Sequence, residues 1–102
     1  MGVVVNSQHK INSTVIPANS TISVNKLGGN GIFLYSIYFQ GQATGETDTF
    51  QIKDSSGNIY YSSTAGGLFS PLAVPSGLML VNSASGTVTP TGKVNIIYGV
   101  HL

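Results

Sequence analysis

A chain of 102 residues with four basic and three acidic side chains, a net charge of +1 and no Cys or Trp is the size of one domain with a single modest core. Charged residues make up 7% of it, against about 25% in an average soluble domain, so copies of the chain repel one another little. The composition excludes a disulfide framework and thiolate metal sites, and isolated Lys residues without Arg argue against nucleic-acid binding.

Short apolar and β-branched stretches, separated by turn residues, run along the whole chain, and no window has the spacing of an amphipathic helix. The pattern predicts almost no helix and one all-β domain over residues 1–102, an antiparallel sandwich or barrel. In chain order, the eight expected strands are Val3–Asn6, Asn12–Ile16, Thr21–Leu27, Gly31–Gln40, Thr49–Lys53, Asn58–Ser62, Leu78–Asn82 and Lys93–Val100.

The stretch Gly31–Gln40 is apolar on both of its faces. Strict alternation places Phe33, Tyr35, Ile37 and Phe39 on one face and Ile32, Leu34 and Tyr38 on the other. A strand that is apolar on both sides is covered on both sides. We therefore expect one face to lie in the core and the other to form a subunit interface, to which the C-terminal Val100 and Leu102 also contribute.

The connections between the expected strands indicate an antiparallel arrangement. The turn Asp54-Ser55-Ser56-Gly57-Asn58 joins two alternating stretches, as a type I turn closed by a left-handed Gly does in many hairpins. The stretch Leu68–Pro75 lacks alternation and contains two Pro residues, so we expect a long crossover.

The longest apolar run of the chain, 32–39, is much shorter than the ~20 residues of a membrane-spanning helix, so we expect no membrane partner.

Residues that carry catalysis or hold metals are few. Glu46 and Asp48 could point the same way from a loop and offer oxygens to Ca²⁺, but solubilising loop charges are the favoured interpretation. His9 and His101 lie near opposite ends of the chain, and no nucleophile elbow or phosphate-binding loop is present. We expect no catalytic residue, no metal, no cofactor and no enzymatic activity.

Tyr60 and Tyr61 are the residues that a binding hypothesis would use. Neighbours in a strand point to opposite faces, so one ring belongs to the core and the other is exposed. An exposed Tyr beside Asn and Gln can stack against a sugar or anchor a partner, while a cross-strand aromatic pair that stabilises the sheet is the alternative.

Four stretches in this order, 31–39, 50–58, 75–81 and 94–98, resemble small decoration or head-auxiliary proteins of tailed-phage virions. The resemblance covers about Gly31 to Val100 and lies in strand order and turn placement. It implies a jelly-roll protomer, commonly a homotrimer, that sits on the capsid protein lattice of a bacteriophage and reinforces it. The function expected from it is therefore a non-enzymatic virion structural protein, a capsid decoration protein that self-associates.

A second function class fits the same composition. A carbohydrate-binding β-sandwich module, free or as a receptor-binding tip, would place Tyr60 or Tyr61 in a patch that stacks a glycan. A third class, a hydrolase, would need Glu46 or Asp48 close to His9 or His101.

Overall fold

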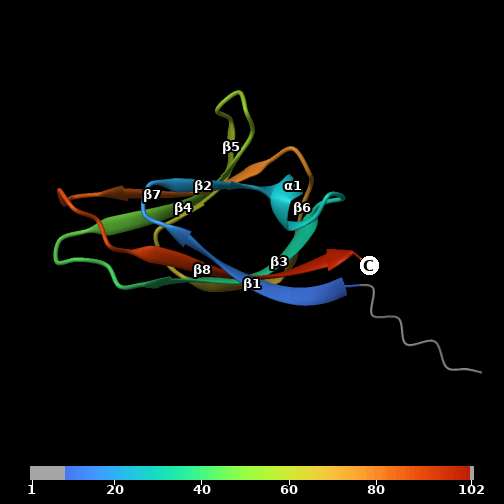
Figure 1. Cartoon of the computed structure of the whole chain (residues 1–102), viewed down its shortest axis with the longest axis horizontal. Coiled ribbons are helices and arrows are strands. Elements are labelled where there is room, and N and C mark those ends of the chain that lie inside the picture. The colour runs from blue at the N-terminus through green and yellow to red at the C-terminus, as the bar shows by residue number, and fades with distance from the viewer. Residues whose placement is uncertain (1–8, 102) are drawn as a thin grey trace, which may run out of the picture.

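The computed structural model describes residues 9–101, which form two four-stranded sheets packed face to face (Figure 1). Sheet A has the strand order β1-β8-β3-β6, and sheet B has the order β2-β7-β4-β5. The elements are β1 (His9–Pro17), β2 (Ser20–Ser23), α1 (Val24–Leu27), β3 (Ile32–Gln40), β4 (Thr47–Lys53), β5 (Ile59–Ser63), β6 (Gly67–Val74), β7 (Met79–Ser85) and β8 (Lys93–His101). The expected strand Val3–Asn6 lies outside the described residues.

The strand order is that of a jelly roll. The first four strands pair with the last four in reverse order, β1 with β8, β2 with β7, β3 with β6 and β4 with β5, and every pair is antiparallel. A single antiparallel ribbon that folds over on itself produces this pairing. Successive strand pairs along the ribbon then belong to alternate sheets. The prediction of an all-β, antiparallel sandwich of jelly-roll type is confirmed.

One hydrophobic core fills the space between the sheets. Alternate side chains of the central strands point inward and are almost completely buried, as the period of two requires. The core residues are Ile16, Val24, Ile32, Leu34, Ile37, Phe50, Ile52, Val74, Leu80, Val94, Ile96 and Tyr98. Helix α1 is a single turn that replaces the end of the expected strand Thr21–Leu27, and its Val24 is part of this core.

A β-bulge in β3 makes the predicted division of its two faces wrong. Leu34 lies opposite Tyr98 of β8, and Ser36 lies opposite the next residue, Ile97, so Tyr35 is the extra residue of the bulge. The bulge reverses the alternation halfway along the strand. Leu34 and Ile37 therefore both point into the core, at 0% and 2% exposure.

The expected crossover Leu68–Pro75 is also wrong, because most of this stretch is the edge strand β6. Leu72 pairs with Leu34 and Leu68 pairs with Ser36, so the three residues 69–71 lie opposite the single bulged residue Tyr35. This irregularity hides the alternation in the sequence. Pro71 is tolerated because an edge strand has one side on which no ladder hydrogen bond is needed.

Candidate functional site

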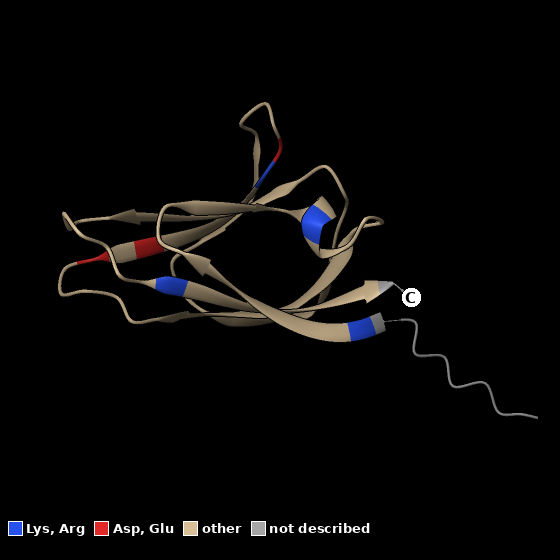
Figure 2. Cartoon of the chain, in the orientation of Figure 1, with Lys and Arg blue, Asp and Glu red and all other residues tan. Residues whose placement is uncertain are grey.

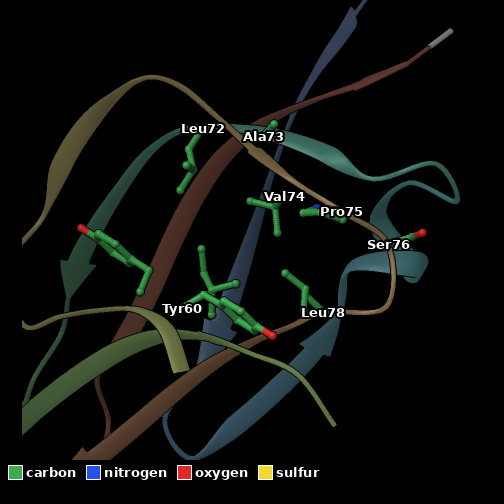
Figure 3. Close-up of a pocket in the computed structure, with 9 residues that line it drawn as sticks. Tyr60, Leu72, Ala73, Val74, Pro75, Ser76 and Leu78 are labelled. Atoms are coloured by element: carbon green, nitrogen blue, oxygen red, sulfur yellow. The ribbon is translucent and has the colours of Figure 1, made fainter. Parts of the chain in front are cut away.

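A pocket of about 380 Å³ lies between the edge strands β5 and β6 (Figure 3). Leu72 and Val74 of β6 face Tyr60 and Leu78 across the same space, whereas the Ala73 side chain between them points away from it. The lining contains no charged residue, and the hydroxyl groups of Ser76 and the two tyrosines are its polar side-chain groups. Its volume and apolar character are those of a small-ligand cleft.

A second β-bulge brings both tyrosines to this pocket. Ile52 of β4 lies opposite Tyr61 and the next residue, Lys53, lies opposite Ile59, so Tyr60 is the extra residue of β5. A bulge re-aims the side chain that it carries. Tyr60 is 62% exposed and still lines the pocket together with Tyr61, so the expectation of rings on opposite faces is replaced by two rings at one cleft.

Asp54 holds the Tyr60 ring in place. Its Oδ2 accepts hydrogen bonds from the Tyr60 hydroxyl at 2.8 Å and from Asn58 Nδ2 at 2.9 Å, while its Oδ1 accepts the backbone N–H groups of Ser56 and Asn58. The hydrogen bonds from Asn58 and Tyr60 lower the pKa of Asp54 from 3.8 to about 2, and the same carboxylate raises the pKa of Tyr60. The four donors occupy both carboxylate oxygens, so Asp54 positions the ring and leaves ligand contact to the ring itself.

Tyr61 belongs to the core as well as to the pocket. Its ring packs against Phe50 and Phe69, with centroid distances of 6.2 and 5.4 Å. Such tilted and edge-on contacts are the favoured aromatic geometries. Tyr60 is therefore the exposed aromatic of this cleft and Tyr61 is its inner wall.

The outer face of sheet A is a second candidate surface. Strand register places three uncharged rows across it: Ile11, Gly99, Phe33 and Ala73; Ser13, Ile97, Ser36 and Leu68; and Val15, Asn95 and Tyr38. Ile11, Val15, Tyr38 and Leu68 are 42–88% exposed. Charged residues lie at strand ends, in a turn and in α1, and the middle of this sheet carries none (Figure 2).

The structure separates the residues that were predicted for a subunit interface. Ile37 lies in the core, and Phe39 and Val100 pack against it. Phe33 is half-buried on the outer face of sheet A, Tyr35 is the half-buried bulge residue, and Leu102 lies outside the described residues. Strand β3 does contribute to an exposed apolar surface, the outer face of sheet A. Tyr38 lies on that face together with Phe33, although strict alternation assigned the two residues to opposite faces. The neighbouring Leu68 was missed because β6 was not recognised as a strand.

Glu46 and Asp48 form a third cluster, where the β3–β4 connection meets the start of β8. Both are buried, at 8% and 0% exposure, so the interpretation as solubilising loop charges is wrong. Three backbone N–H groups point at the Glu46 carboxylate: Ala43 and Thr91 donate to Oε1 at 3.0 and 2.9 Å, and Gly92 donates to Oε2 at 2.9 Å. The spacing Asp48-x-Phe50-x-Ile52 was the sequence signal for an inward Asp48.

The two carboxyl groups interact with each other across Gly92. The contact with the Asp48 carboxyl group, opposed by burial and reinforced by the three N–H groups, lowers the pKa of Glu46 from 4.5 to about 2. Burial, followed by the contact with Glu46, raises the pKa of Asp48 above its ordinary 3.8. A side chain at Gly92 would collide with both carboxyl groups, because a Cβ there would lie 2.6 Å from each oxygen of Asp48.

The geometry that a hydrolase would need is not formed. His9 pairs with His101 at one end of sheet A, and Glu46 lies against Gly92 at the other end of β8. The nine residues of β8 span about 30 Å at ~3.3 Å per residue. Among the described residues, no three His, Cys, Asp or Glu side chains come together as metal ligands. Nor does the described part of the chain contain a helix long and apolar enough to cross a membrane.

No protein-family model matches the chain, and no curated protein matches it in sequence.

Proposed function

We propose that this chain is a non-enzymatic structural protein of a virion, a decoration protein that self-associates and sits on a capsid lattice. The observation that carries the self-association is the uncharged outer face of sheet A, with Tyr38 and Leu68 exposed by 49% and 88%. The virion role is supported by the resemblance in strand order and turn placement over Gly31 to Val100. Jelly rolls occur in viral capsid and lectin domains, so the fold is compatible with the role without deciding it.

A second copy of the chain is the occupant that best fits this face. Its three rows carry no charge, so two such faces bring no unpaired charge into the contact and need no charged partner groups. The net charge of +1 adds little repulsion between whole molecules. Exposed apolar patches of this kind mark protein interaction sites. We propose a trimer, the form that the family resemblance implies.

Light scattering at low and high protein concentration tests the proposal. We expect a concentration-independent trimer, and Leu68→Asp should convert it to monomer, because a carboxylate would be buried unpaired in the contact. Val88→Asp is the matched control: Val88 is 99% exposed in the β7–β8 connection, away from the outer face of sheet A. A wild-type monomer at high concentration, or equal effects of the two variants, would reject self-association through this face.

A carbohydrate-binding module or receptor-binding tip is the second candidate function, and the Tyr60 cleft favours it. The ring is exposed, its orientation is fixed by Asp54, and the cleft beside it is uncharged. A sugar would place its apolar face on the ring and hydrogen-bond to groups at the rim, such as Ser76.

A glycan array distinguishes the second candidate from the first. Binding should disappear in Tyr60→Ala and persist in Ile59→Ala, since Ile59 is 52% exposed on the same strand but is not part of the pocket lining. Tyr61→Ala is a poorer test, because that ring also packs against Phe50 and Phe69. An array without signal for a folded wild-type protein would leave the structural role as the function of the chain.

A further inference from the structure

The ends of the two sheets meet at a cluster of buried oxygen atoms that lack a hydrogen-bond donor. Both oxygens of Asp48 and Oδ1 of Asn82 are buried without a hydrogen-bond partner in the described structure. The Asn82 amide nitrogen already donates to the Ile16 carbonyl at 3.0 Å. A buried acceptor without a donor costs free energy, and an ionised carboxylate has no donor of its own. A proton on one of these oxygens, or a cation between them, would remove this cost.

We propose that Asp48 is protonated and shares its proton with ionised Glu46, so that an acid–carboxylate hydrogen bond joins these two side chains at the end of sheet B and breaks when the proton is lost. The proton converts Asp48 from an acceptor into a donor and removes one of two adjacent buried charges. Glu46 is the ionised partner because three N–H groups already stabilise its negative charge. The raised pKa of Asp48 and the lowered pKa of Glu46 agree with this division.

The surroundings favour a proton over a cation. Ca²⁺ takes about six to eight oxygen ligands, whereas three orphan oxygens are found here. The N–H groups that surround Glu46 direct positive partial charge at the site and would repel a metal ion.

Among the described residues, no cation lies against the pair. Asn82 of β7 and Gln42 of the β3–β4 connection favour the ionised form of Asp48, but burial and Glu46 act against it and the pKa is raised. Neither amide titrates, and neither does Gly92, which directly precedes β8. Lys93 follows Gly92 but is exposed, and alternation turns it toward the outer face of sheet A.

Asp48 follows Glu46 by two residues, and Glu46 in turn accepts hydrogen bonds from Thr91 and Gly92, which are distant in sequence. Glu46 ends the β3–β4 connection, Asp48 lies in β4 of sheet B, and Gly92 directly precedes β8 of sheet A. Loss of the shared proton would place two negative charges side by side in the interior. The β3–β4 connection, whose Glu46 is close to the surface, is the part that can move to separate them. The pair therefore acts as a pH-sensitive contact at this end of the sandwich, which weakens as the pH rises.

A ¹³C NMR titration of the side-chain carboxyl groups tests the proposal on the wild-type protein. The chain has three acidic side chains, so the Glu signal is unique and Asp54→Asn assigns the two Asp signals. We expect Asp48 to lose its proton at a pH above its ordinary 3.8, after Glu46 and Asp54 have ionised. An Asp48 signal that titrates near its ordinary 3.8 would overturn the proposal.

The unfolding equilibrium supplies a second test. Asp48→Asn keeps a neutral side chain of the same shape, so it removes the proton dependence. Above the ordinary pKa of 3.8, the unfolding constant of the wild type should rise relative to Asp48→Asn by up to about tenfold per pH unit, until Asp48 ionises in the folded state. Parallel pH profiles of the two proteins would contradict a protonated Asp48.

A comparison with and without Ca²⁺ distinguishes a shared proton from a bound cation. We expect the melting temperature at pH 7 to be the same in Ca²⁺ and in EDTA. A Ca²⁺-dependent rise in the wild type that Asp48→Asn lacks would identify a cation site and overturn the shared proton.

Discussion

At the residue scale, the unusual feature of this chain is that its few charges are held by specific contacts. Asp54 accepts four hydrogen bonds in one hairpin, and Glu46 accepts three backbone N–H groups from two segments. A protein with three acidic side chains has thus placed all of them in structured positions. Their removal should affect stability more than the removal of ordinary surface charges.

Gly92→Ala should destabilise the fold. The new methyl group would overlap both carboxyl groups of the buried pair, so the pair or the start of β8 must shift. Overpacking of this kind costs about 1–3 kcal/mol, measured by denaturant unfolding. Gly29→Ala is the control, because a Cβ there meets nothing within 4 Å, and its stability should be close to that of the wild type. Equal effects of the two substitutions would contradict the tight contact at Gly92.

The lowered pKa of Asp54 predicts that the folded protein loses stability in acid. Its pKa is lowered to about 2 in the folded protein, so the stabilising effect of its charge is complete above its ordinary 3.8 and is lost as the pH falls toward 2. The melting temperature of Asp54→Asn should therefore lie below that of the wild type at pH 6, and the difference should shrink between pH 4 and pH 2. Ser55→Ala, in the same turn, should show no such convergence. A pH-independent difference for Asp54→Asn would mean that its charge is not the cause.

At the scale of the element, the bulges at Tyr35 and Tyr60 decide which side chains face the core and which face outward. The first allows β3 to bury Leu34 and Ile37 and to expose Tyr38. The second turns Tyr60 to the same cleft as Tyr61. Both candidate surfaces of this protein therefore depend on one extra residue in a strand.

Adjacent substitutions in β3 test the first bulge. Ile37→Asp would bury a charge in the core and should cost about 4 kcal/mol or more, enough to unfold a small domain. Tyr38→Asp should leave the circular-dichroism melt nearly unchanged and instead reduce the mass seen by light scattering. A folded Ile37→Asp together with an unfolded Tyr38→Asp would show that the register is that of an unbroken strand.

Most of the strands could be predicted from the sequence, but the features that define the sites could not. Alternation and turn residues located β3, β4, β5, β7 and β8 and parts of β1 and β2, because these signals are local. The bulge at Tyr35 leaves no local signal, and it reversed the predicted faces of β3. The pairing of Glu46 with Gly92 joins residues far apart in the chain, so it depends on the jelly-roll pairing and not on a motif.

At the scale of the whole molecule, the fold offers two broad sheet faces and one open side between β5 and β6. The exposed apolar residues of sheet A lie on a face, whereas Tyr60 lies at the open side. Assembly through the face would leave the cleft accessible. Self-association and ligand binding are therefore compatible in one protein, and the variants at Leu68 and Tyr60 should affect them separately.

The placement of charge at strand ends has a consequence for the medium in which such a protein can work (Figure 2). Salt screens the attraction between exposed charges and so weakens ionic contacts. A contact through the three uncharged rows of sheet A contains no charge pairs, so salt should not weaken it. The mass of the proposed trimer should be unchanged between 50 mM and 1 M NaCl, and dissociation in 1 M NaCl would point to an ionic contact. A coat of the kind that we propose would stay on its particle on passing between fresh water and brine.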